Sequence, residues 1–118
     1  MADWSIKIQQ AGAQAEFVPQ LQPGGPTGLN VSTGDVVSWN NATAEAHQPW
    51  PADSNYQPLP ESEVTRGTSS YLSDIIPPDH SSRPSWIAAS PPGVAIPATV
   101  YYVCRLHPNE HGVITITS

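Results

Sequence analysis

The chain has 118 residues, of which ten are acidic and four are Lys or Arg, so its formal charge is −6 at pH 7. This length is enough for one hydrophobic core, and we expect residues 1–118 to form a single domain. The acidic balance argues against nucleic acid or an anionic membrane surface as a partner. The sequence contains no apolar run approaching the roughly 18 residues that cross a bilayer, so no membrane span is predicted.

Alternation of apolar and polar residues predicts short strands in the first third of the chain. Residues 4–9 alternate regularly and predict a half-buried strand. A second extended piece covers residues 17–18. Residues 29–31 and 36–39 resume the alternation on either side of a Gly-Asp turn, which predicts a hairpin.

The remainder of the chain predicts an all-β protein. Residues 49–97 are rich in Pro and Ser and predict mostly loop, with short strands at 71–76 and 85–88. Residues 99–103 are the most β-prone run, and residues 113–117 alternate as a last strand. About seven short strands separated by turns predict an antiparallel Greek-key β-sandwich or barrel with a long Pro/Ser-rich loop region.

The chemistry-bearing residues lie at the end of the most β-prone run. Cys104 is the only cysteine, so it is a buried thiol, a reactive thiol or a metal ligand. His107 follows it by three residues, and both side chains can reach one metal ion. His47 follows the other well-marked strand, and copper sites of the blue type use a trigonal plane of two His and one Cys.

These residues resemble those of the plastocyanin and amicyanin type of cupredoxin. Trp39 precedes His47 by eight positions, as the aromatic residue of that pattern precedes its first ligand histidine. The short ligand loop of amicyanin-like proteins is matched in register by Cys104, His107, Pro108 and Gly112. The similarity covers nearly the whole chain except roughly 49–92. It implies a cupredoxin-like sandwich holding one copper ion, Cu(I) or Cu(II), through His47, Cys104 and His107.

The axial position departs from this pattern. Glu110 stands where the family has methionine, and the only methionine of the chain is Met1. A carboxylate ligand would favour Cu(II), lower the potential by about 59 mV for each ~1.4 kcal/mol, and shift the colour from blue toward green or red. In donor set the site is similar to nitrosocyanin, a red copper protein. Water, the Ala46 carbonyl and His111 are the alternative fourth ligands.

Two functions are expected from such a site. The first is one-electron transfer through a His₂Cys(Glu) centre, with a redox partner docking near His107 on apolar residues such as Leu106, Pro108, Pro49 and Trp50. The alternative is redox catalysis on nitric oxide, superoxide or peroxide at an atypical green or red copper site. We expect an electron carrier more than an enzyme. Copper storage and a metal-free adhesive sandwich fit the pattern less well.

The resemblance also predicts supporting roles and a setting. The backbone N–H of Gln48 would donate to the thiolate, and Asn41 would support the ligand loop from within. Asn30 and Asn41 each begin a glycosylation sequon, and His80 is expected at the surface. Relatives work in the periplasm or other extracytoplasmic spaces, so we expect the same location, a monomer, and a mature chain that starts at an added Met1.

Overall fold

The computed structural model describes residues 2–19, 28–65, 68, 70–83, 85–91 and 93–118. These residues form eight strands and one short 3₁₀ helix. The elements are β1 (Asp3–Ala11), β2 (Gln14–Pro19), β3 (Leu29–Val31), β4 (Val36–Asn41), β5 (Pro49–Ala52), η1 (Glu61–Glu63), β6 (Trp86–Ile87), β7 (Ala98–Cys104) and β8 (His107–Ile116). No helix in this described part of the chain has the length and apolar character required to cross a membrane.

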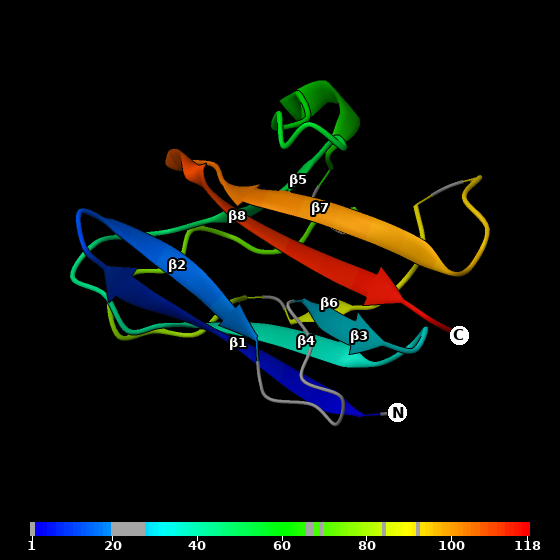
Figure 1. The fold of residues 1–118 in the computed structure, drawn as a ribbon, viewed down its shortest axis with the longest axis horizontal. Helices are drawn as coiled ribbons and strands as arrows, with labels where there is room; N and C mark the ends of the chain where they lie inside the picture. The colour runs from blue at the N-terminus through cyan, green and yellow to red at the C-terminus, as the bar shows by residue number, and fades with distance from the viewer. Residues whose placement is uncertain (1, 20–27, 66–67, 69, 84, 92) are drawn as a thin grey trace.

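The strands form two four-stranded sheets that pack face to face (Figure 1). One sheet has the order β2-β1-β4-β6 and the other has the order β3-β8-β7-β5. The β1–β4 and β3–β8 pairs are parallel, and the remaining pairs are antiparallel. The predicted all-β sandwich is therefore confirmed, but its sheets are mixed and not purely antiparallel.

The predicted hairpin of residues 29–31 and 36–39 is wrong. β3 pairs with β8 in one sheet, whereas β4 pairs with β1 and β6 in the other. The Gly34-Asp35 turn thus carries the chain from one layer to the other. Alternation identifies the buried face of a strand but not its neighbour, which explains the error.

The core lies between the two layers and is built from the inward positions of the strands. Ile6, Trp39, Tyr102 and Ile114 are fully buried there. The Tyr102 ring meets Trp39 edge to face with centroids 5.4 Å apart, and it meets Phe17 at 4.9 Å. Such aromatic pairs add to the stability that the burial of their surface provides. The ends of the strands are thereby held in fixed positions.

The long segment between residues 49 and 97 contains two short strands. The prediction of a strand at 71–76 is wrong, since only Ile76 forms an isolated bridge, to His47. The prediction at 85–88 corresponds to β6. β5 lies inside the predicted loop, and it tolerates its two prolines because it is an edge strand.

One part of this segment covers the outer face of the second sheet. η1 lies on the outer side of β5 and β7 (Figure 1). Beneath it, the Trp50 indole N–H donates to the Leu59 carbonyl at 2.7 Å, and the Arg105 guanidinium lies 4.3 Å from the centre of the Trp50 ring. Glu61 of η1 pairs with Arg105 at 2.5 Å. The segment therefore stabilises the turn that follows Cys104.

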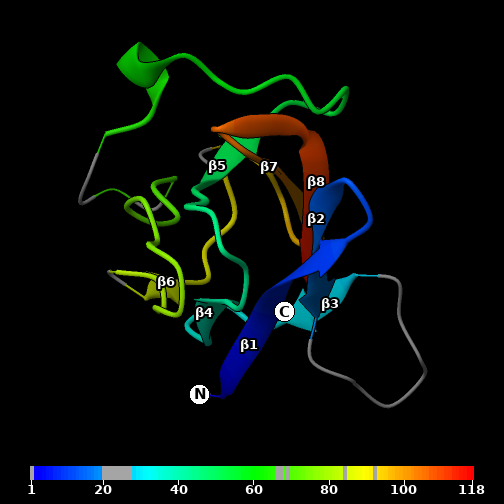
Figure 2. The same ribbon diagram turned by 90° about the vertical axis from the view of Figure 1, so that its left-hand side faces the viewer.

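The two ends of the sandwich differ in what they carry. Both chain termini lie at one end, and the β1–β2 and β7–β8 turns lie at the other (Figures 1 and 2). The ligand residues suggested by the sequence belong to the β7–β8 turn and to the loop after β4. The fold thus brings them to the end of the molecule away from the termini.

Candidate metal centre

Four side chains of metal-ligating type meet at this end of the sandwich. They are His47, Cys104, His107 and Glu110, and one ligand atom from each lies within 4.8 Å of the others. His47 follows β4, Cys104 ends β7, and His107 and Glu110 belong to β8. The structure therefore brings together all four residues that the sequence singled out.

A bulge in the β7–β8 hairpin turns Glu110 inward. Val103 pairs with His111, but the next pair joins Cys104 to His107. Residues 108–110 of β8 are therefore extra and have no partner on β7. Pro108 and Asn109 are exposed in this bulge, while Glu110 is buried. The bulge thus places a carboxylate under two imidazoles and a thiol.

The hydrogen bonds of His47 fix which ring nitrogen faces the centre. Its Nε2 lies 2.8 Å from Thr43 Oγ1. The single hydroxyl proton of Thr43 is directed to Asn41 Oδ1 at 2.7 Å or to the Glu45 carbonyl, which are both acceptors only. This network favours the tautomer in which Nε2 donates to Thr43 and the Nδ1 lone pair faces the centre. Burial lowers the pKa of His47, which keeps the ring neutral.

Asn41 supports this loop, as predicted. Its amide nitrogen donates to the carbonyls of Glu45, Ile76 and Pro77, and its Oδ1 accepts from the Thr43 N–H. The side chain is buried, and both its nitrogen and its oxygen are hydrogen-bonded, so the amide nitrogen of Asn41 is not available for glycosylation. The same network holds the segment between β4 and His47 in one conformation.

The second imidazole is oriented by an acidic neighbour that the sequence did not suggest. His107 Nε2 lies 3.0 Å from Glu45 Oε2. A carboxylate only accepts, so Nε2 carries the proton and Nδ1 faces the centre, 3.5 Å from the Cys104 sulfur. The sequence alone offers little sign of this role, because Glu45 is an exposed acidic residue and only the fold places it beside His107.

Cys104 lies at the floor of the centre and is fully buried. Its sulfur is 3.5 Å from His47 Nδ1 and accepts the backbone N–H of Gln48 at 3.4 Å, as predicted. Burial raises the pKa of the thiol, while the backbone N–H groups of Gln48, Leu106 and His107 act in the opposite direction. The sulfur therefore sits in a dry site that already contains donors for a thiolate.

The surroundings of the Glu110 carboxylate show whether a cation fits between the four side chains. Its Oε2 accepts the backbone N–H of Ala15 at 2.9 Å, whereas its buried Oε1 contacts no polar group other than the two imidazoles. Oε1 lies 3.0 Å from His47 Nδ1 and 3.8 Å from His107 Nδ1. With Nε2 of each ring engaged by Thr43 or Glu45, a cation bound by both Nδ1 atoms and Oε1 would satisfy all three buried groups at once. The donor set therefore fits a metal ion.

Other residues named from the sequence lie elsewhere. His111 is exposed and stacks on Tyr56 with centroids 4.4 Å apart, so it is not part of the cluster. His80 is exposed, as predicted. Pro49 and Trp50 are buried, so the expectation that they form a docking surface is wrong. They are covered by the segment that follows β5.

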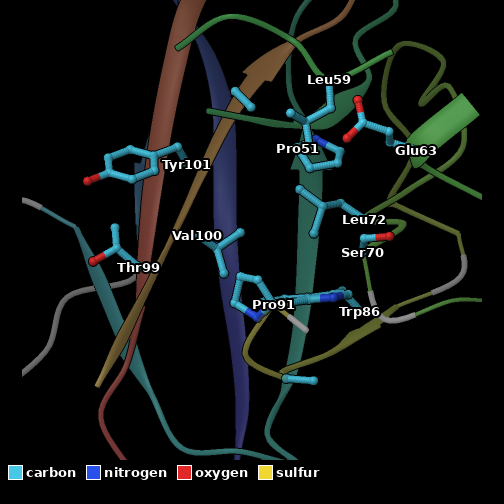
Figure 3. A pocket seen from close by; sticks show the side chains of 12 residues that line it. Pro51, Leu59, Glu63, Ser70, Leu72, Trp86, Pro91, Thr99, Val100 and Tyr101 are labelled. Carbon is cyan, nitrogen blue, oxygen red and sulfur yellow. The ribbon is translucent and has the colours of Figure 1, made fainter. Parts of the chain in front are cut away.

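Two cavities differ in their relation to this centre. A cavity of about 240 Å³ is lined by His47, His107 and Glu110 together with Glu45 and the β1–β2 turn. A larger one, of about 460 Å³, lies between β5, β7 and the Pro-rich segment, where Leu72, Trp86 and Val100 face it (Figure 3). Its lining is mainly apolar and holds none of the four ligand-type residues.

Comparisons with known proteins place the fold. Neither the family models nor the curated proteins gave a match to the sequence. Among solved structures, a purple cupredoxin from Nitrosopumilus maritimus is similar with a TM-score of 0.61 and 16% identity, over 96% of this chain and 98% of that one. Amicyanin from Paracoccus versutus is similar with a TM-score of 0.54 and 12% identity, over 95% and 78%. An amicyanin variant in the reduced state is similar with a TM-score of 0.52 and 16% identity, over 95% of this chain and 81% of that one. The chain therefore has the cupredoxin fold.

Proposed function

We propose that this protein binds one copper ion through His47, Cys104, His107 and Glu110 and transfers single electrons. The observation that carries the proposal is the inward-facing set of two imidazole nitrogens, one thiol sulfur and one buried carboxylate oxygen, all within 4.8 Å of one another. Copper would supply a one-electron couple, which the softness of the thiolate and the imidazoles suits in both oxidation states. The fold of the similar structures supports the same function.

Rigid support of the ligands favours electron transfer. His47 is held by Thr43, His107 by Glu45 and Glu110 by the Ala15 N–H. Groups held in this way need little rearrangement between oxidation states, and little rearrangement makes the exchange of an electron fast. The exposed edge of His107, with Leu106 and Pro108 beside it, is the proposed docking point for a redox partner.

The first experiment is addition of one equivalent of Cu(II) to the reduced apoprotein, followed by visible absorption and electron paramagnetic resonance spectra. We expect intense thiolate-to-copper bands that disappear in Cys104→Ser. His80→Asn is the matched control, because His80 is an exposed imidazole outside the cluster and the variant should give the wild-type bands. Bands that survive in Cys104→Ser, or that never form, would refute the copper site.

The 240 Å³ cavity favours a second candidate, redox catalysis on a small molecule such as nitric oxide, superoxide or peroxide. It reaches His47, His107 and Glu110, so a diatomic or triatomic ligand could approach the fourth position. Azide added to the Cu(II) protein distinguishes the two functions. Spectra that azide leaves unchanged would end the catalytic proposal, whereas a new charge-transfer band would support it.

We further propose that the protein acts as a monomer in the periplasm or another extracytoplasmic space. A copper thiolate in a reducing cytoplasm would compete with abundant free thiols for the metal. Analytical ultracentrifugation and fractionation of the native host test these two points separately.

A further inference from the structure

The four ligand side chains differ sharply in how far they reach solvent. Cys104 is 0% exposed, His47 is 1% exposed and Glu110 is 3% exposed, whereas His107 is 34% exposed. An ion that loads into the folded apoprotein must therefore pass the His107 side. The 240 Å³ cavity opens on this side, since His107, Pro108 and Asn109 all line it.

The lining of this cavity selects for positive charge. Its charged side chains among the described residues are the carboxylates of Glu45 and Glu110, and it contains no Lys or Arg. Glu45 is the outer of the two, with a side chain 69% exposed. A cavity that carries carboxylates and no cationic group concentrates cations at its mouth.

Glu45 also contacts His107, the ligand on the side from which the ion enters. Its Oε2 contacts the outer nitrogen of His107, Nε2, while Nδ1 points inward. The carboxylate can therefore bind a cation at the mouth without occupying a lone pair that the centre needs. A carboxylate oxygen binds copper more weakly than imidazole and thiolate do, so transfer of the ion from Glu45 to the centre lowers its free energy.

We infer that Glu45 is the first ligand of a copper-loading route, capturing Cu(II) at the cavity mouth and passing it to His107 and Cys104. This inference rests on the proposed copper function and adds a transient metal site to it. The ion keeps its oxidation state, and the thiol proton of Cys104 leaves to solvent when the thiolate binds.

The test is stopped-flow uptake of Cu(II) by the reduced apoprotein at low ionic strength, followed through the thiolate-to-copper band. Glu45→Gln keeps an acceptor for His107 but loses the charge, and we expect its second-order rate to fall about tenfold. Glu45→Asp keeps the charge and should stay within about threefold of wild type. Asp3→Asn removes a charge at the opposite end of β1 and should load at the wild-type rate.

The endpoints separate this inference from the copper site itself. Glu45→Gln should still develop the intense thiolate-to-copper bands to full amplitude, because His47, Cys104, His107 and Glu110 are intact and the new amide oxygen still accepts from His107 Nε2. Wild-type loading by Glu45→Gln would overturn the route and leave the copper site standing. Loading by Glu45→Asp as slow as by Glu45→Gln would also overturn it, because the charge would then not be the cause. If wild type develops no band, the proposed function fails first.

Discussion

A single side chain, Glu110, sets the character of the candidate centre. One of its oxygens is held by the Ala15 N–H, and the other is buried and directed at two imidazole nitrogens. A hard anionic ligand stabilises Cu(II) more than Cu(I). The potential of the copper protein is therefore expected to be low, and the thiolate-to-copper bands are expected to be shifted from those of a blue site.

Replacing this ligand should reverse both effects. We expect Glu110→Met to turn the copper protein bluer and to raise its potential, by about 59 mV for each ~1.4 kcal/mol of Cu(II) preference that is lost. Visible spectroscopy and protein-film voltammetry measure the two changes. Asp3→Asn is the control, since it removes an exposed carboxylate at the end of β1 away from the centre. An unchanged colour and potential in Glu110→Met would show that Glu110 is not a ligand.

The residues of the centre were easier to predict from the sequence than the residues that hold them in place. Cys104 and His107 stand three residues apart at the end of a strong strand, and the resemblance to cupredoxins joins His47 to them, so the sequence predicts the three as a group. Glu110 was found because it occupies a methionine position. Glu45 was not, because its contact with His107 joins two loops that only the sheet topology brings together. The burial of Trp50 was missed for the same reason.

At the scale of elements, Asp35 joins the starts of β1 and β4. Its carboxylate accepts the backbone N–H of Ala2, the backbone N–H of Ser32 and the indole N–H of Trp4, each at 2.9 Å. These hydrogen bonds lower the pKa of Asp35 from 3.8 to about 2. A pKa that is lower in the folded state means that the charged carboxylate stabilises the fold.

The sign of this shift gives a pH-dependent prediction. The contribution of Asp35 is complete above pH 3.8 and is lost as the pH falls toward about 2. We expect Asp35→Asn to be less stable than wild type at pH 7, with a difference that shrinks between pH 4 and pH 2. Urea unfolding across this range measures it. Asp3→Asn, which alters an exposed carboxylate at the start of β1, is the control, and an equal loss in both variants would contradict the assignment.

The strands themselves were predicted better than their pairing. Period-two alternation identified β1, β4 and β8 because each has one face in the core. It could not identify β5, whose Pro49–Ala52 sequence lies inside a Pro-rich segment and joins the sheet only at its edge. Parallel pairing of β1 with β4 leaves no local signal, since partners so distant in the chain are chosen by the whole core.

At the scale of the molecule, the centre is built on a core that does not depend on the metal. Trp39 and Tyr102 pack between the sheets, and the residues around them are apolar and buried. The three candidate ligands His47, His107 and Glu110 are already held by contacts with Thr43, Glu45 and the Ala15 N–H. This contrasts with small metal domains that fold only when the metal binds.

Removal of copper should therefore loosen the centre but leave the fold intact. A ligand that binds only the folded state stabilises it, by about 2.7 kcal/mol at a free concentration one hundred times its Kd, so we expect the copper protein to melt at a higher temperature than the apoprotein. The near-ultraviolet circular dichroism of Trp39 and Trp86 should be retained in the apoprotein, because both belong to the buried hydrophobic core. The melting temperature of Cys104→Ser should equal that of the apoprotein, whether or not copper is added. Loss of the aromatic signal on metal removal would instead mean that the carboxylate and imidazoles repel strongly enough, without a cation between them, to open the sandwich.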